Sequence, residues 1–365
     1  MTPDPKRVET PIGLVDLERA RANAASVAGY AAEHGLRWRP HIKTHKSLEI
    51  ARIQLAAGAT GLTVATPREA EVMSELTDDL LLAYPPVGAA KLERVARIAE
   101  RVDLKVALDA ADVLRPLASA ASAAGVTVGV LVELDVGLGR VGVQTPEQVL
   151  ELARSATDLE GVAFRGVQFY PGHIRGPQAD QGPAVARVSE RLAETLEALR
   201  SEGLEPEIVS GGSTPTLRRS HEIAGLTEIR SGSCIFYDRE GLAIGIATED
   251  TVAYTVLATV VSTAVPGSAV VDAGSKALSK EERGGDAGYG FVLEHPEVLV
   301  KGLSEEHGVL DLSGSDWTPS IAERVRIVPN HVCVSVNLQD RLLARDGDGH
   351  HWVALEARGR DAWSG

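Results

Sequence analysis

The segment LRWRPHIKTHKSLE, residues 36–49, concentrates side chains that could do chemistry: two lysines and two histidines fall between positions 41 and 46. A lysine that is partly buried beside other cations can be held as a neutral amine, and a neutral amine can form a Schiff base with an aldehyde. Lys43 ends a strand-like run, which makes it the candidate for this role. A solvated basic loop is the alternative that the segment alone leaves open, and His41 fits a strand-end residue.

Four later segments combine glycine with polar or aromatic side chains. Glycine allows backbone N–H groups to approach a phosphate closely, and (β/α)8 barrels commonly bind phosphate after their last two strands. Taken alone, SGGST favours a tight loop with a hydroxyl cap. Together with Lys43, these loops predict a cofactor with both an aldehyde and a phosphate, pyridoxal 5′-phosphate, whose pyridine nitrogen faces Arg140. The candidate residues are Arg140 in LDVGLGRVGV, Tyr170 and His173 in QFYPGHI, Gly212, Ser213 and Thr214 in SGGSTP, and Gly232 and Ser233 in SGSCIFYD.

A second kind of site is suggested near the end of the chain, in PNHVCVSVN. We expect this run to be a strand, so that His331 and Cys333, two positions apart, point to one face. An imidazole and a thiolate suit Zn²⁺, and two protein ligands leave positions open for water or substrate. As an isolated pattern, H-x-C favours two buried core residues instead.

The elements that would position these residues alternate regularly from about residue 36 to residue 234. Apolar runs that alternate with helix-like segments predict a parallel sheet covered by helices, and eight such units fit a (β/α)8 TIM barrel better than an open sheet. Lys43 and the glycine-rich segments then lie at the carboxyl ends of strands, where barrels carry their active sites. The predicted strands are 36–43, 61–65, 79–84, 103–109, 126–135, 161–170, 207–212 and 226–236, and predicted helices include 47–57, 67–76, 88–101 and 180–202.

The pattern changes after Tyr237, where strand-like runs follow one another with little helical periodicity. The first two surround a turn at Pro266–Gly267. We therefore expect a barrel over residues 15–238. Residues 239–365, together with residues 1–14, should form a mostly β domain that carries the metal site. The run at 10–17 either joins this β domain or leads into the barrel.

The composition excludes several classes of protein. A net charge of −14 argues against nucleic-acid binding, and no apolar run is long enough for a membrane span. The N-terminal residues contain neither a signal-peptide core nor an amphipathic targeting helix. Two cysteines cannot form a disulfide framework. We therefore expect a cytoplasmic protein with reduced thiols and without nucleic-acid or membrane partners.

Taken together, these motifs resemble those of the D-threonine aldolase and D-serine dehydratase family, pyridoxal phosphate enzymes of the alanine-racemase type, fold type III. The resemblance covers nearly the whole chain and rests on RPHIKTHKS, LDVGLGRVGV, SGGSTP, GSCIFYD, VDAGSKALS and PNHVC. It implies a homodimer whose active sites lie between the barrel of one subunit and the β domain of the other.

The resemblance also implies roles for individual residues. Lys43 would be the Schiff-base lysine and Arg140 the partner of the pyridine nitrogen, while the groups at 212–214 and 232–233 would hold the phosphate. His331 and Cys333 would bind a divalent metal near the β-hydroxyl of the substrate. We expect Zn²⁺, with Mn²⁺ and Mg²⁺ as alternatives.

The expected reaction follows from positions at which this chain differs from the aldolase members of the family. Aldolase members typically have an aspartate at the position of Cys333 and GGGTG at that of GGSTP, so both differences resemble the dehydratase branch. We expect a D-3-hydroxy amino acid substrate, first D-serine, converted to pyruvate and ammonia. The alternative is retro-aldol cleavage to glycine and an aldehyde, followed by a racemase or a non-catalytic pyridoxal phosphate-binding protein. Tyr170 and His173 are candidates for a second acid/base group, although QFYPGH matches neither branch closely and Ser231 replaces a common proline.

Overall fold

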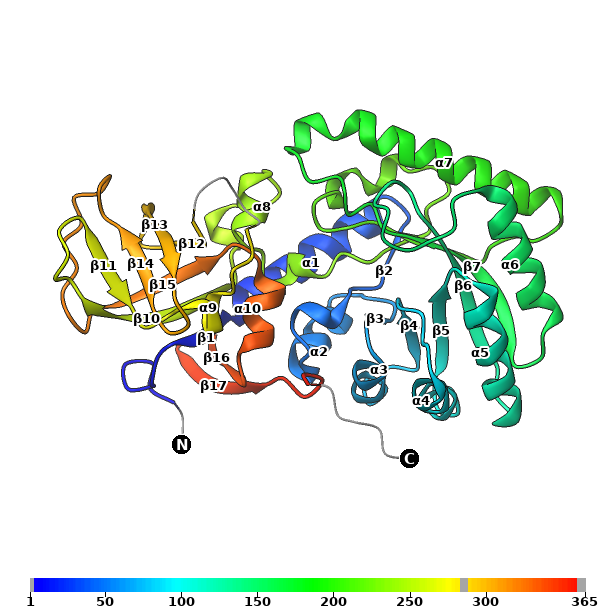
Figure 1. Cartoon of the computed structure of the whole chain (residues 1–365), viewed down its shortest axis with the longest axis horizontal. Helices are drawn as coiled ribbons and strands as arrows, with labels where there is room; N and C mark the ends of the chain where they lie inside the picture. Colours follow the sequence, from blue (N-terminus) through cyan, green and yellow to red (C-terminus); the bar gives the residue numbers. More distant parts are fainter. Residues whose placement is uncertain (1–2, 283–287, 360–365) are drawn as a thin grey trace. The chain divides into compact units, whose positions relative to one another are not determined.

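The computed structural model describes residues 3–282 and 288–359 and divides into two compact units (Figure 1). The parallel-sheet unit comprises Val27–Lys43, Gln54–Gly232 and the described residues from Glu356 onwards. The β unit comprises the described residues up to Ser26, together with Thr44–Ile53 and Ser233–Leu355. Helices α1 (Leu17–Glu33) and α2 (Leu48–Ala56) contribute residues to both units, so the chain passes between them more than once.

The parallel-sheet unit is built on one eight-stranded sheet with the order β2-β9-β8-β7-β6-β5-β4-β3. Its strands are β2 (Arg37–Trp38), β3 (Leu62–Val64), β4 (Asp79–Leu82), β5 (Asp103–Leu108), β6 (Val128–Leu134), β7 (Val162–Phe169), β8 (Ile208–Gly211) and β9 (Glu228–Ile229). Every neighbouring pair is parallel. All eight predicted strands are thus present, and β6 is buried along its whole length, as its continuous apolar sequence requires.

Helices cover the outer side of this sheet (Figure 1). They are α3 (Pro67–Met73), α4 (Ala89–Ala99), α5 (Ala111–Ala123), α6 (Pro146–Asp158) and α7 (Gly182–Ser201). Two of these helices begin in the same way. Thr66 and Thr145 are the N-caps of α3 and α6, and each is followed by a proline in the first turn, where a backbone N–H would have no partner within the helix. These caps fix the points at which the chain leaves the sheet.

The predicted (β/α)8 barrel is matched only approximately. The outermost strands β2 and β3 are joined by an isolated bridge between His41 and Thr63 and by the hydrogen bond from Thr63 N to Pro40 O, 2.9 Å, rather than by a full ladder. Pro40 has no N–H to offer to a ladder, which explains why the predicted strand 36–43 is extended for only two residues. The fold is an α/β parallel sheet with flanking helices, combined with a separate antiparallel β unit.

A layer of buried charges crosses the amino-terminal ends of the parallel strands. Arg39, 1% exposed, donates from Nε to Glu228 at 3.0 Å and from Nη1 to Asp79 at 2.6 Å. Lys105 Nζ donates to the same Asp79 carboxylate at 2.5 Å. Burial opposes the charge on Asp79, but its hydrogen bonds to Arg39 and Lys105 keep the pKa of Asp79 below its usual value. The strands are therefore joined at this end by paired charges.

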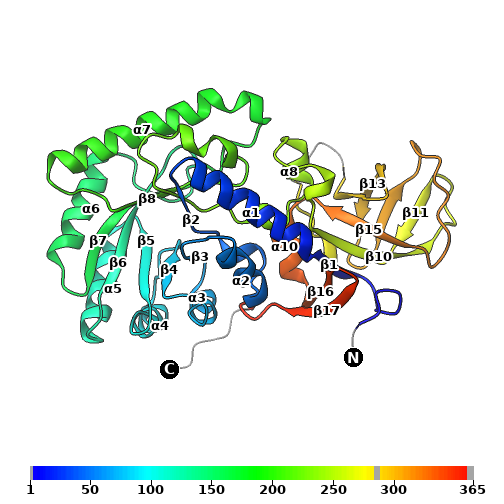
Figure 2. The same cartoon turned by 180° about the vertical axis from the view of Figure 1, so that it is seen from behind.

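The β unit is built on a nine-stranded sheet with the order β11-β14-β13-β12-β15-β10-β1-β16-β17. Its strands are β1 (Ile12–Asp16), β10 (Tyr254–Ser262), β11 (Ser268–Val271), β12 (Gly290–Val292), β13 (His295–Leu303), β14 (Gly308–Asp311), β15 (Arg324–Pro329), β16 (Arg341–Asp346) and β17 (Gly349–Ala354). Because β11 also pairs with β10, strands β10 to β15 close into a ring, seen from behind in Figure 2. The predicted turn at Pro266–Gly267 is confirmed, and β1 joins this sheet.

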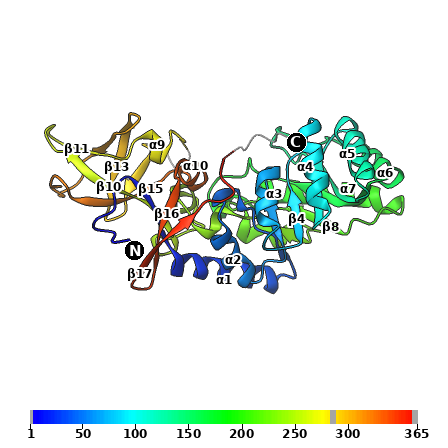
Figure 3. The same ribbon diagram turned by 90° about the horizontal axis from the view of Figure 1, so that it is seen from below.

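The prediction that PNHVCVSVN is a strand is wrong from Val332 onwards, because these residues form helix α10 (Val332–Leu338). Val332, Ser335 and Val336 are buried at helical spacing, and this packing outweighs the strand preference of the valines. In Figure 3, α10 lies beside α9 (Ser275–Leu278), and the Ser335 hydroxyl donates to Ala277 O at 2.7 Å. The remaining helix of the β unit is α8 (Arg239–Ala243). Among the described residues, no helix combines the length and apolarity needed to cross a membrane.

Candidate active site

Lys43 lies in a short 3₁₀ turn, Ile42–Thr44, just beyond the carboxyl end of β2. Its backbone N–H is directed at Nδ1 of His41, 3.5 Å away, so His41 helps to shape the turn, in keeping with a strand-end residue. The Lys43 side chain is half-buried, and its Nζ lies 5.7 Å from the centre of the Tyr170 ring. The amine is thus held against an aromatic face near the carboxyl ends of the parallel strands.

Tyr170 brings a second predicted residue to the same place. The guanidinium carbon of Arg140 lies 4.9 Å from the centre of the Tyr170 ring. Gly172 makes room for this ring, because a Cβ at that position would lie 2.2 Å from Tyr170 Cε1. Lys43, Arg140 and Tyr170, which come from three separate strand ends, therefore form one cluster.

The loop that carries Arg140 is shaped by a carboxylate. Asp135 Oδ1 accepts hydrogen bonds from the backbone N–H groups of Gly137, Leu138 and Gly139 at 3.0–3.1 Å. Burial opposes the charge, but these N–H donors, with Gly139 foremost, lower the pKa of Asp135. The loop ends at Gly142, whose φ of +111° and close approach to the Asp135 backbone exclude a side chain. Arg140 thus projects from a loop of fixed shape.

The two glycine segments predicted to bind phosphate lie against each other and against the lysine turn. The Ser231 hydroxyl donates to Ser213 O at 2.9 Å, which joins the loops after β8 and β9. Gly232 packs so closely on His41 that a Cβ would lie 2.2 Å from the His41 carbonyl oxygen. Gly212 has a φ of +86°, a conformation that favours glycine. Two glycine loops beside a lysine turn fit a phosphate-bearing aldehyde cofactor.

The hydroxyl groups predicted for the phosphate site differ in their surroundings. Ser213 Oγ lies 3.0 Å from Thr216 Oγ1 and caps its own loop, so it is already engaged. Thr214 is buried, with 8% of its surface exposed. Ser233 belongs to the β unit, where its carbonyl accepts from Phe236 N at 3.1 Å in a 3₁₀ turn.

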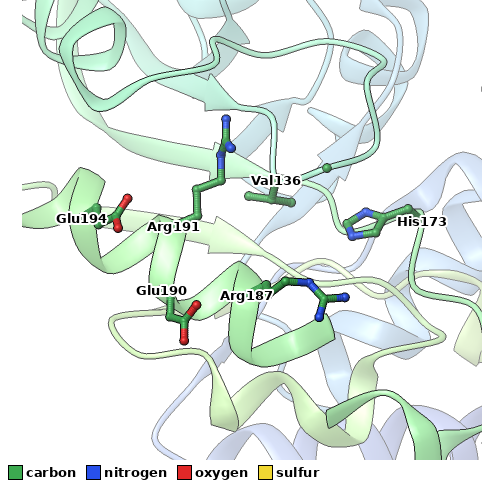
Figure 4. A pocket seen from close by; sticks show the side chains of 7 residues that line it. Val136, His173, Arg187, Glu190, Arg191 and Glu194 are labelled. Carbon is green, nitrogen blue, oxygen red and sulfur yellow. The ribbon is translucent and has the colours of Figure 1, made fainter. Parts of the chain in front are cut away.

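His173 lines a cavity beside helix α7. This cavity of about 510 Å³ is also lined by Val136 and charged residues of α7, as Figure 4 shows. Its ring packs on Gly137, where a Cβ would lie 3.2 Å from Nε2. The Arg187 side chain extends from α7 toward His173 in this view. The cavity thus offers charges of both signs beside His173.

Glu133, Gln168 and Arg230 form a buried polar group near the strand ends, and Glu133 and Arg230 were not predicted as site residues. Glu133 on β6 accepts from Gln168 Nε2 on β7 at 3.0 Å, and burial raises the pKa of Glu133. Arg230 is fully enclosed; its burial lowers its pKa to about 10, although Glu133 opposes this change. Gln168 Oε1 is buried without a hydrogen-bond partner in the described part of the chain, which leaves an acceptor for a bound group.

The metal-ligand candidates lie at the start of α10 in the β unit. His331 is the N-cap of α10, and its Nδ1 lies 3.0 Å from Asp238 Oδ2. Asp238 is held in place by its own contacts: its Oδ2 accepts from Val332 N at 2.9 Å and its Oδ1 from Gly241 N at 3.0 Å. A ligand atom from each of Asp238, Glu240 and His331 falls within 4.8 Å of the others.

Cys333 follows in the first turn of α10 rather than on a strand, so the reason given for its pairing with His331 does not hold. Its Sγ lies 3.2 Å from Oγ1 of Thr44, the residue after Lys43. Burial opposes a charge on His331, but the Cys333 thiolate and the Asp238 carboxylate outweigh it and raise the pKa of His331 to about 11. The anionic groups that favour the protonated form of His331 would also attract a metal cation. An imidazole, a thiolate and carboxylates are suitable ligands for a divalent metal.

Asp238, Glu240 and Thr44 were not predicted as site residues. Asp238 precedes a helix-like segment, a position that indicates an N-cap but not a metal partner. Thr44 stands within the quoted RPHIKTHKS motif, but its partner Cys333 is 289 residues away. Only the folded chain joins these residues.

Comparison with known families agrees with this organisation. The model "Alanine racemase, N-terminal domain" matches residues 15–240, and the model "Putative serine dehydratase domain" matches residues 253–344. The D-threonine aldolase of an Arthrobacter species is 33% identical over 97% of this chain and 93% of its own length. The D-threo-3-hydroxyaspartate dehydratase of a Delftia species is also 33% identical, over 95% of this chain and 97% of its own. The D-serine dehydratase of Dictyostelium discoideum is 26% identical over 96% and 98%.

Solved structures show the same relationship. The crystal structure of D-threonine aldolase from Filomicrobium marinum superposes with a TM-score of 0.89 at 32% identity and covers 97% of this chain and 96% of that one. A cysteine-to-alanine variant of D-threo-3-hydroxyaspartate dehydratase, described as the metal-free form, superposes at 0.88 with 31% identity over 97% and 99%. The chain therefore belongs to the fold type III pyridoxal phosphate-dependent enzymes, in the lyase family that joins an alanine racemase N-terminal domain to a serine dehydratase domain.

Proposed function

We propose that this protein is a pyridoxal phosphate- and divalent metal-dependent dehydratase of a D-3-hydroxy amino acid, with D-serine as the first substrate to test. The reaction removes the α-proton and the β-hydroxyl of D-serine as water. Addition of water to the released product then frees ammonia and leaves pyruvate. The observation that carries the proposal is the pairing of His331 and Cys333 beside the Asp238 carboxylate, a donor set for a Lewis-acid metal.

The thiol at position 333 supports the dehydratase reaction over the aldolase reaction. The structure of a cysteine-to-alanine variant of a dehydratase relative is described as the metal-free form. A metal bound to His331 and Cys333 would supply a Lewis acid for the departing hydroxyl. Zn²⁺ fits an imidazole and a thiolate best, with Mn²⁺ and Mg²⁺ as the alternatives.

Most of the remaining groups belong to the parallel-sheet unit, and Ser233 belongs to the β unit. Pyridoxal phosphate, when bound, supplies an electron sink for the bond that breaks at Cα. Lys43 would hold its aldehyde carbon, Arg140 its pyridine nitrogen, and the loops at Gly212–Thr214 and Gly232–Ser233 its phosphate. The Lys43 amine would accept the α-proton of the substrate. Tyr170 and His173 are the candidates for returning a proton.

A second candidate function is retro-aldol cleavage, and it is favoured by the 33% identity to the D-threonine aldolase of Arthrobacter. The same metal would then help to remove the proton of the β-hydroxyl, and the Cα–Cβ bond would break to give glycine and an aldehyde. The orientation of the substrate decides between the two outcomes, so product analysis distinguishes them.

The test is a product assay of the purified protein loaded with pyridoxal phosphate. D-serine, D-threonine and D-threo-3-hydroxyaspartate are each supplied, and 2-oxo acid, ammonia, glycine and aldehyde are measured. We expect equimolar pyruvate and ammonia from D-serine; glycine with an aldehyde would establish the aldolase reaction instead. EDTA should abolish turnover and Zn²⁺ should restore it, whereas turnover indifferent to EDTA would remove the metal from the mechanism.

A homodimer with shared active sites remains part of the proposal. Helix α10 exposes Val334 and Leu338 one turn apart, 36% and 38% accessible, next to Cys333. A second subunit that covered this face of α10 would remove both side chains from water. Light scattering should give twice the 38.5 kDa chain mass, and a monomer at assay concentration would contradict this part of the proposal.

A further inference from the structure

The contact between Thr44 and Cys333 is a specific polar interaction in a buried place. Thr44 is 1% exposed, and its Oγ1 lies 3.2 Å from Cys333 Sγ, within hydrogen-bonding reach for sulfur. A hydroxyl has one proton to donate, and a thiolate is a far better acceptor than a thiol is a donor. When Cys333 is ionised, as a metal requires, the Thr44 hydroxyl is therefore the donor.

The segment that carries Thr44 is fixed by its neighbours in the β unit. His45 is fully buried, its Nδ1 accepts from Ser47 N at 3.1 Å, and its ring meets that of Phe236 edge-on at 6.4 Å. The segment continues directly into helix α2. The Thr44 hydroxyl is thus presented to Cys333 by a rigid stretch, and a rigid donor can set the direction of a ligand.

We propose that Thr44 is a positioning residue of the metal centre, whose hydroxyl donates a hydrogen bond to the thiolate of Cys333. The bond orients Sγ and withdraws part of its negative charge, so that the bound metal remains a stronger Lewis acid. It complements Asp238, which orients the other ligand, His331, through Nδ1. This inference rests on the proposed metal-dependent function and extends it to a residue adjacent in sequence to the cofactor lysine, Lys43.

The test compares Thr44→Val, which keeps the shape but removes the hydroxyl, with Thr44→Ser, which keeps the hydroxyl. Both proteins are prepared with pyridoxal phosphate, stripped of metal with a chelator and titrated with Zn²⁺ and with Co²⁺. The Co²⁺ form reports the thiolate directly through its sulfur-to-metal charge-transfer absorbance. The visible absorbance of lysine-bound cofactor, measured in the same samples, shows whether the cofactor site is intact.

We expect Thr44→Val to bind Zn²⁺ about 10-fold to 100-fold more weakly and to shift the charge-transfer band to lower energy, because the thiolate becomes more electron-rich. Thr44→Ser should restore both properties, and the cofactor absorbance should match that of the unchanged protein in each case. Thr44→Ala, which also lacks the hydroxyl, repeats the test if the valine variant does not fold. Native metal affinity and band position in the variants without a hydroxyl would overturn the inference, as would a serine variant that behaves like valine.

Failure of the proposed function gives a different result. If the unchanged protein binds no Zn²⁺ and shows no charge-transfer band with Co²⁺, the metal-dependent function is wrong, and the role of Thr44 is overturned with it. If the unchanged protein shows both and the Thr44 variants do not differ from it, only the role of Thr44 is overturned.

Discussion

The carboxylate of Asp238 holds the ring of His331, with Oδ2 3.0 Å from Nδ1, and this leaves Nε2 as the ring atom available to a metal. Both Asp238 oxygens already accept backbone N–H groups, from Gly241 and Val332, so the carboxylate acts as a fixed partner of the ring. Partners of this kind orient a histidine ligand and raise its basicity.

We therefore expect Asp238→Asn to weaken Zn²⁺ binding by about 10-fold to 100-fold. Competition with a chromophoric chelator measures this change on the otherwise intact protein. Asp348→Asn, which removes an exposed carboxylate from the same unit, is the matched control and should bind the metal normally. Equal affinity in Asp238→Asn and in the control would show that Asp238 does not position His331.

Lys43 should be the residue that binds pyridoxal phosphate covalently, since its amine lies in the cluster with Arg140 and Tyr170. Lys43→Ala should lose the visible absorbance that the cofactor shows when joined to a lysine, and should lose turnover. Lys91→Ala removes an exposed lysine of α4, which lies over the ring of Tyr84, and should retain both. An unchanged visible spectrum in Lys43→Ala would refute the assignment of this lysine.

The parallel-sheet unit could be predicted closely because local sequence carries its signal. Strands that are buried on both faces have nearly continuous apolar sequences. A Thr-Pro pair marks the residue at which α3 begins, and another marks the start of α6. Strand ends were less predictable: Pro40 interrupts the first strand, and β9 covers only Glu228–Ile229 of the predicted 226–236.

The candidate metal site was harder to predict because its sequence signals conflict or lie far apart. The valines around Cys333 favour a strand by propensity, but their burial at helical spacing decides for α10. His331 and Cys333 were identified by residue type alone. Asp238 and Thr44 come from segments 93 and 289 residues away from their partners, and nothing in a single sequence pairs them.

Asp135 should stabilise the loop that presents Arg140. Its Oδ1 collects three backbone N–H groups, and hydrogen bonds to a charged group contribute about 1.5–3 kcal/mol. We expect Asp135→Ala to lower the free energy of unfolding by about this amount and to weaken pyridoxal phosphate binding, and Asp135→Asn to do so less, because an amide oxygen still accepts. Thermal unfolding and cofactor titration measure the two effects. Asp158→Ala, at an exposed position of α6, is the control, and an Asp135→Ala protein that matches it would contradict this role.

Gly232 should be required for the fit between the lysine turn and the loop proposed to bind phosphate. A Cβ at this position would lie 2.2 Å from the His41 carbonyl oxygen, and backbone cannot yield as a flexible side chain can. Overpacking of this kind costs about 1–3 kcal/mol of folding stability unless the loop shifts. A loop that has shifted should bind the cofactor more weakly. Gly176→Ala has open space around its Cβ and should bind the cofactor normally. Titration of Gly232→Ala and Gly176→Ala with pyridoxal phosphate measures the two affinities. Equal affinities would show that cofactor binding does not depend on the close contact at Gly232.

The buried charges around Asp79 should make the parallel-sheet unit sensitive to acid. Because Arg39 and Lys105 hold the pKa of Asp79 below its usual value, about 3.9, its ionised form is favoured in the folded state. The resulting stability is present above the unfolded pKa and is lost as the pH falls through the lower folded pKa. Asp79→Asn should therefore unfold at lower urea concentration at pH 7, with a loss of about 3 kcal/mol, since Arg39 keeps Glu228 as a partner.

The difference between Asp79→Asn and the unchanged protein should shrink as the pH is lowered below about 4, because protonation of Asp79 then removes from the unchanged protein the charge that the variant already lacks. Urea midpoints measured from pH 7 to pH 3 test this expectation. Asp112→Asn breaks an exposed ion pair with Arg115 and should change stability by less than about 1 kcal/mol at any pH. A difference for Asp79→Asn that stays constant down to pH 3 would mean that the shape of the carboxylate, rather than its charge, joins these strands.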